Sequence, residues 1–104
     1  MKLEKDHAFT RDEAVARIRA LTDYWDTKHG TSTTWSGNSA RITGKVKGVS
    51  FDGHFSVEER RLLADVKVGF FAEMIGGKAY VERKVDDYLN PGNSLESLQA
   101  RVTA

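Results

Sequence analysis

The first regular pattern along the chain is helical. Apolar residues recur three or four positions apart over residues 11–29, which is the spacing of one buried stripe. Thr10 and Glu13 have the spacing of a capping box at the start, and Gly30 supplies a left-handed cap at the end. Glu13 and Arg17 lie four positions apart, in the favourable order for an ion pair on the solvent side. The pattern predicts a helix over residues 11–29 with Arg17 on its wet face.

The centre of the chain changes to a period of two. Apolar and polar residues alternate along segments 40–46, 49–57 and 62–70, after a β-branched and aromatic segment at 31–35. Consecutive strands with one apolar and one polar face predict an antiparallel meander that is covered on one face and solvated on the other. Residues 3–9 alternate more weakly and offer a short additional edge strand.

The covering layer requires a second helix, and the chain offers one before residue 90. Its apolar stripe consists of Phe71, Met74, Ile75, Val81, Val85, Tyr88 and Leu89. Gly76-Gly77 interrupts the stripe, so this helix either crosses the sheet closely at the glycine pair or begins after it. Asn90-Pro91-Gly92 ends it. Residues 91–104 are then a C-terminal extension that forms a short helix or is disordered.

Together these elements predict one α+β domain over residues 1–90. We expect an antiparallel β-meander of about four strands with two α-helices packed on one face, in the order (β)-α-β-β-β-β-α. A length of 104 residues suits a single domain. No segment has the roughly 20 apolar residues of a membrane-spanning helix, and the charged N-terminus lacks the apolar stretch of a secretory signal. We therefore expect a cytoplasmic protein with no membrane span.

Charge and composition narrow the classes of function. Sixteen Lys and Arg residues against 15 Asp and Glu residues leave a formal net charge of +1, and cysteine is absent. A balanced charge argues against extensive phosphate binding. The order α-β-β-β-α also occurs in double-stranded-RNA-binding domains, but those carry a lysine cluster at the start of the last helix, where this chain has Lys78 alone. We expect no nucleic-acid partner, and the lack of cysteine removes thiolate chemistry.

The candidate catalytic and metal-binding residues do not form a recognised constellation. His7, His29 and His54 lie in three different elements, and none has the spacing of a metal ligand pair. His54 shares a polar strand face with Asp52 and Ser56, but on an open face all three side chains point into solvent, whereas a catalytic triad requires a shielded setting. We expect no catalytic residue, no metal site and no cofactor.

One apolar surface remains to be explained. Phe70 and Phe71 are adjacent, and adjacent side chains on a strand cannot face the same core. Leu63, Phe71 and Met74 are therefore a candidate apolar interaction patch for a partner or a hydrophobic surface. The alternative is that Phe71 turns inward where the second helix begins.

Several short motifs between residues 3 and 89 resemble those of one family of small bacterial proteins. They are His7-Ala8-Phe9 with the helix after it, Trp35-Ser36-Gly37, Gly48-Val49-Ser50-Phe51-Asp52-Gly53, Val66-Lys67-Val68-Gly69-Phe70-Phe71 and Val81…Val85-Asp86…Leu89. The chain resembles the polyhydroxyalkanoic acid (PHA) system, or granule-region, proteins. Genes of that family accompany genes for making and using a storage polyester. The resemblance implies an accessory role and assigns no catalytic residue.

Three hypotheses of function follow. The leading one is a non-enzymatic accessory protein that associates with a granule surface or a PHA-related protein, with homodimerisation as a further expectation because a small open sheet has edges to protect. The second is a binder of small hydrophobic ligands with a cavity between the sheet and the helices. The third is an enzyme that acts on PHA-related esters, for which His54 and His7 are the available candidates.

Overall fold

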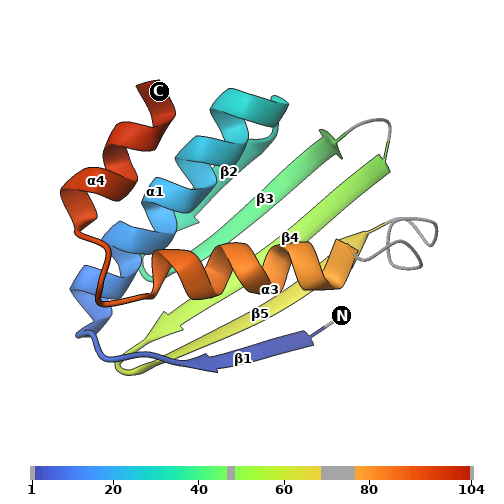
Figure 1. Cartoon of the computed structure of the whole chain (residues 1–104). Helices are drawn as coiled ribbons and strands as arrows, with labels where there is room; N and C mark the ends of the chain where they lie inside the picture. Colours follow the sequence, from blue (N-terminus) through green and yellow to red (C-terminus); the bar gives the residue numbers. More distant parts are fainter. Residues whose placement is uncertain (1, 47–48, 69–76, 104) are drawn as a thin grey trace.

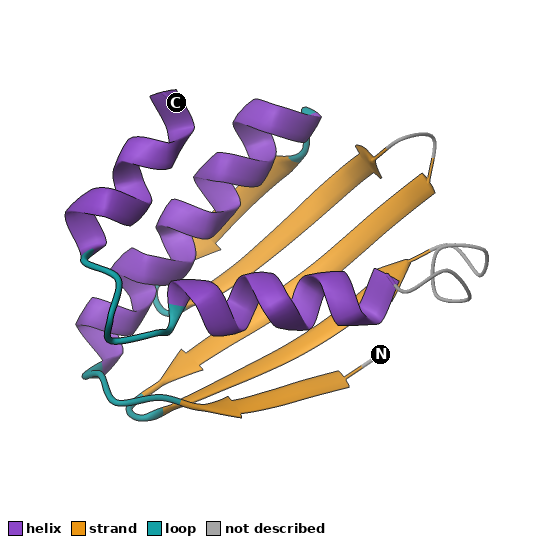
Figure 2. Cartoon of the chain, viewed as in Figure 1, coloured by secondary structure: helices purple, strands orange, loops and turns teal. Residues whose placement is uncertain are grey.

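The helices of this protein lie together on one face of an antiparallel sheet (Figures 1 and 2). The computed structural model describes residues 2–46, 49–68 and 77–103. The elements are β1 (Lys2–Asp6), α1 (Arg11–His29), β2 (Ser32–Ser36), β3 (Ser39–Val46), β4 (Val49–Glu58), β5 (Arg61–Val68), α3 (Gly77–Tyr88) and α4 (Leu95–Ala100), followed by one 3₁₀ turn (Arg101–Thr103). The predicted α+β class is confirmed. The sheet has five strands instead of about four, because residues 2–6 pair as a regular edge strand.

The sheet has the strand order β1-β5-β4-β3-β2, and every neighbouring pair is antiparallel. Strands β2 to β5 form the predicted meander, while β1 pairs with β5 at the far edge, with Leu3 opposite Ala64. A two-residue turn joins β2 to β3. Gly37, its first residue, has φ 59°, which glycine adopts without strain and which suits a tight hairpin. This turn places Ser36 opposite Ser39 and thereby sets the register of β2 against β3.

Alternating apolar residues of the strands and the apolar stripes of α1 and α3 form the core. Its most deeply buried members, each at most 2% exposed, include Ile18, Leu21, Ile42, Phe55, Val57, Leu62, Val66, Val81, Val85, Tyr88 and Leu98. Trp25 packs its ring against those of Phe51 and Phe55, at centroid distances of 5.9 and 6.3 Å. In the described part of the chain, the space between the layers is thus occupied by side chains. This packing gives no support to the hypothesis of a ligand cavity between the sheet and the helices.

The capping interactions of α1 explain why it has the predicted bounds. The Thr10 hydroxyl accepts a hydrogen bond from the Glu13 backbone N–H at 3.3 Å. At the other end Gly30 has φ 72°, and its N–H donates to the Asp26 carbonyl. The Glu13 carboxylate, expected to complete a capping box, instead pairs with Arg17 (Nε to Oε2, 3.4 Å).

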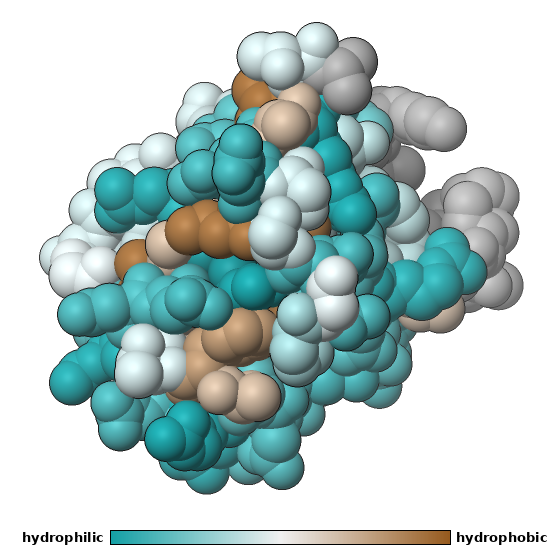
Figure 3. All heavy atoms as spheres, turned by 60° about the vertical axis from the view of Figure 1, so that its left-hand side comes forward, coloured by the Kyte–Doolittle hydropathy of each residue, from teal (hydrophilic) through white to brown (hydrophobic). Residues whose placement is uncertain are grey.

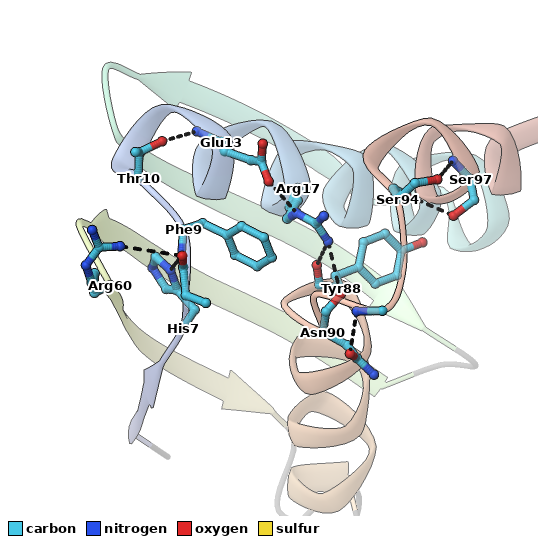
Figure 4. A network of polar contacts seen from close by, with 12 residues as sticks. His7, Phe9, Thr10, Glu13, Arg17, Arg60, Tyr88, Asn90, Ser94 and Ser97 are labelled. Atoms are coloured by element: carbon cyan, nitrogen blue, oxygen red, sulfur yellow. Dashed lines mark hydrogen bonds and ion pairs between the residues drawn. The ribbon is translucent and has the colours of Figure 1, made fainter.

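The prediction that Arg17 lies on the wet face of α1 is wrong, since the residue is 4% exposed. Its Nη1 donates to the carbonyl oxygens of Tyr88 at 3.2 Å and Asn90 at 3.3 Å, as Figure 4 shows. The guanidinium also lies 4.0 Å from the centroid of the Phe9 ring. The C-terminal carbonyls of a helix lack partners within it and carry the negative end of its dipole. Arg17 therefore provides, from the protein interior, a hydrogen-bond donor for the carbonyl groups at the C-terminal end of α3.

The C-terminal segment packs beside α1 (Figure 1). Ser94 caps α4 by accepting from the Ser97 N–H at 3.1 Å, and Leu98 is fully buried. Arg101 forms an ion pair with Asp87, and its guanidinium lies 5.1 Å from the Tyr88 ring centroid. Residues 95–100 are thus helical, while the division of the chain at residue 90 stays a prediction.

Candidate functional site

The face of the sheet opposite the helices carries a hollow formed by described residues of the strands. The hollow has a volume of about 940 Å³ and takes side chains from all five strands. Since strand residues alternate between faces, the polar half of the pattern projects from this face. The lining also includes the apolar residues Leu3, Ala40, Phe55, Leu63 and Ala64. We call this surface the open face. It is the candidate site because it is concave and collects polar groups that converge from separate strands.

The strand register arranges the hollow in two rows that run across the strands. The first row consists of Thr34, Arg41, His54, Asp65 and Lys2 from β2, β3, β4, β5 and β1. We call it the charged row. Positive and negative groups are mixed along it, so this row does not present a field of one sign.

The second row lies beside the first and begins with hydroxyl groups. Ser36, Ser39 and Ser56 are directly opposite one another on β2, β3 and β4, and we call them the serine row. Leu63 and Glu4 continue it on β5 and β1. Within the described chain, none of the three serine hydroxyls is engaged in a hydrogen bond. They are therefore available to a ligand.

Asn38 holds the backbone of the serine row in place. Its Nδ2 donates to the Val57 carbonyl at 2.7 Å, and the Val57 N–H donates to the Asn38 carbonyl at 2.9 Å. These bonds join the β2–β3 turn to β4 next to Ser39 and Ser56. The spacing of the serine row is consequently fixed by backbone pairing.

The Arg41 guanidinium is committed to a neighbouring carboxylate. Its Nε and Nη2 donate to the two Asp52 oxygens at 3.3 and 3.1 Å, and this hydrogen bonding lowers the pKa of Asp52 below its ordinary value. His54 Nε2 lies 3.8 Å from Asp52 Oδ1, and the His54 side chain is 63% exposed. With Ser56 two residues further along β4, the three candidates lie in a line on an open surface.

The other two histidines are not among the residues that line the hollow. His7 Nε2 donates to the Glu58 carbonyl at 3.0 Å. Its Nδ1 accepts from the N–H of Phe9, drawn beside it in Figure 4, at 3.1 Å, so His7 anchors the connection from β1 to α1. His29 ends α1. No cluster of three or more potential metal ligands occurs in the part of the chain that the structure describes.

The predicted apolar patch is only partly within the described chain. Leu63 lies half-buried in the hollow, between Ser56 and Glu4. Phe71 and Met74 lie outside the described residues, so the patch stays a prediction. On the side of the molecule drawn in Figure 3, hydrophobic surface is confined to short strips between hydrophilic side chains.

The sequence analysis did not predict the hollow or the serine row. Polar residues two apart on a strand indicate only a solvated face, and the cross-strand neighbours depend on register. The Ser36-Gly37-Asn38-Ser39 turn was the available signal, because a two-residue hairpin fixes which flanking residues are paired.

These features define a small two-layer α+β protein whose sheet carries charged and hydroxyl-bearing side chains on the face opposite the helices. None of its described helices is long and apolar enough to cross a membrane. A family model described as "putative polyhydroxyalkanoic acid system protein" matches residues 1–91. The chain belongs to this family, which confirms the resemblance found in its motifs. Comparison with the curated proteins and with the solved structures gives no match.

Proposed function

We propose that this protein is a non-enzymatic accessory protein of the PHA system that acts in the cytoplasm at the surface of the polyester granule. Membership of the PHA system family over residues 1–91 carries the proposal. The open face supports it, because a broad, shallow surface suits attachment to an extended object.

The chemistry of the open face favours binding over turnover. A general base or nucleophile requires a partner that holds it and a setting that limits water. His54 is well exposed, and the carboxylate nearest to it is already bound by Arg41. The three serines have no neighbouring base within hydrogen-bond distance in the described structure. We therefore assign the hydroxyls a role in recognition.

Co-sedimentation tests the proposal directly. Purified protein is mixed with isolated polyhydroxybutyrate granules and centrifuged, and the supernatant is assayed for protein. We expect it to pellet with granules stripped of their proteins, or to capture a granule-bound protein from an extract of the granule coat. Protein that stays in the supernatant and captures no granule protein would contradict the proposal.

A homodimer is a further part of the proposal. The sheet ends in the edge strands β1 and β2, and edge strands readily pair with another chain. Four of the five residues of β1 are charged, whereas β2 contains no charged residue. Charged side chains discourage strand pairing, so we assign the dimer contact to β2. Light scattering should give twice the monomer mass, and Thr33→Lys should return the mass to that of a monomer. A monomeric wild-type protein would contradict this assignment.

A further inference from the structure

We propose that the serine row is a docking track for an extended polyester chain of 3-hydroxy acids, lying across the strands with one ester carbonyl at each serine. This inference rests on the proposed function and adds the contact surface and the feature of the polymer that is recognised.

The repeat of the polymer matches the repeat of the sheet. A 3-hydroxyacyl unit has four backbone bonds, against three in an amino-acid residue. Scaling from about 3.4 Å for an extended residue gives about 4.5 Å for one ester unit. Neighbouring strands lie about 4.8 Å apart. Since Ser36, Ser39 and Ser56 lie on three successive strands, an extended chain crossing them meets one serine per unit.

The direction of the carbonyl groups also fits. In an extended zigzag chain, an even number of bonds per repeat places every carbonyl on the same side. All carbonyls of a 3-hydroxyacyl chain can therefore face the sheet together. A repeat of three bonds, as in a polylactate or a peptide, turns alternate carbonyls away and shortens the period to about 3.4 Å.

The polarity of the site suits an uncharged ligand that only accepts hydrogen bonds. A serine hydroxyl can donate to an ester carbonyl, and the hydroxyls of the serine row have no competing partner in the described structure. Two acidic residues, Glu4 and Asp65, and two basic ones, Lys2 and Arg41, also line the hollow, so it presents no field of one sign to a charged ligand. Leu63 follows the third serine and offers apolar contact to the alkyl groups of the chain.

The test uses a water-soluble linear oligomer of 3-hydroxybutyrate, capped at both ends so that it carries no charge, with amide chemical shifts as the readout. The wild-type protein should show saturable shifts at the serine row. The triple variant Ser36→Ala/Ser39→Ala/Ser56→Ala should bind roughly tenfold more weakly, because three hydrogen bonds of modest net value are lost. The double variant Ser32→Ala/Ser50→Ala is the matched control, because these serines share the open face but do not line the hollow, and it should bind as the wild type does.

A capped oligolactate of equal length provides the matched ligand, and it should bind at least several-fold more weakly. The docking proposal is contradicted if the wild-type protein does not bind the hydroxybutyrate oligomer, or if it binds both oligomers equally well. It is also contradicted if the triple variant binds the hydroxybutyrate oligomer as tightly as the wild type does. Granule co-sedimentation of the triple variant separates the two proposals. If it pellets normally while oligomer binding is absent, the granule role stands and the serine row is not its contact surface.

Discussion

Arg17 on the first helix donates a hydrogen bond to the carbonyl oxygen of Tyr88, 71 residues later in the chain. Together with the bond to Asn90, this contact ties the N-terminal helix to the end of α3 through a side chain that is almost fully buried. The fold therefore depends on a charge in its interior, and that charge is stabilised by backbone carbonyls and by the partly exposed Glu13.

Replacing this arginine should destabilise the protein strongly. Arg17→Met keeps the length of the side chain and its helix propensity but leaves two carbonyls without their donor. We expect the free energy of unfolding to fall by about 2–4 kcal/mol in urea titration. Arg11→Met, at an exposed position of the same helix, should change it by less than about 0.5 kcal/mol. A loss below about 1 kcal/mol in Arg17→Met would show that water or another group replaces the guanidinium.

Two tyrosines should respond in opposite directions to removal of the hydroxyl. The Tyr88 Oη is buried with no hydrogen-bond partner in the described structure, and burial raises the pKa of Tyr88 while the Arg101 guanidinium beside its ring opposes this effect. Tyr88→Phe should leave stability unchanged or raise it by up to about 1 kcal/mol. Tyr80 instead accepts from Trp25 Nε1 at 3.2 Å, so Tyr80→Phe should cost about 1 kcal/mol. Thermal unfolding of the two variants side by side measures the difference, and a clear loss in Tyr88→Phe would reveal a partner for its hydroxyl.

The C-terminal helix should contribute to the stability of the whole domain. Leu98 is fully buried against the core, so Leu98→Ala should lower the free energy of unfolding by about 2–4 kcal/mol. Gln99→Ala changes an exposed neighbour on the same helix and should be nearly neutral. If Leu98→Ala is also neutral, the burial of Leu98 does not contribute to the stability of the domain, which would contradict this prediction.

The ion pair between Asp87 and Arg101 predicts a pH dependence of stability. The Arg101 hydrogen bond, with help from the Asn93 side chain, lowers the pKa of Asp87 below its ordinary value of 3.8. The unfolded state therefore binds this proton more readily than the folded state. The stabilisation is fully present above the unfolded pKa and is lost as pH falls through the folded pKa.

The comparison variant is Asp87→Asn, which has no proton to gain. Urea titrations should show the wild type more stable than Asp87→Asn above about pH 5, with the gap closing as the solution is acidified below the ordinary pKa. Glu59→Gln, at an exposed turn position, controls for the change in net charge. A gap that stays constant down to strongly acidic pH would contradict the assigned cause.

The sequence predicted what depends on local pattern. Thr10 and Gly30 mark the ends of α1, and the period of two correctly separates the core face of β3 and β4 from the open face. The sequence analysis wrongly placed Arg17 on the solvent face of α1. Its partners are carbonyl groups distant in the chain, and the pattern of apolar residues along the helix does not indicate them. The serine row was missed for a related reason, since Ser39 and Ser56 become neighbours only through the pairing of β3 with β4.

The connection between Arg17 and Tyr88 also determines when the protein can fold during its synthesis. Among the described strands β1 pairs with β5 alone, and Arg17 can bind both of its carbonyls only after residue 90 has been made. Contacts of such long sequence separation slow folding and must wait for the late parts of the chain. The emerging chain therefore carries an unpaired first strand until residues 61–68 have left the ribosome. Its first helix carries an unburied arginine for longer, until residue 90 has followed.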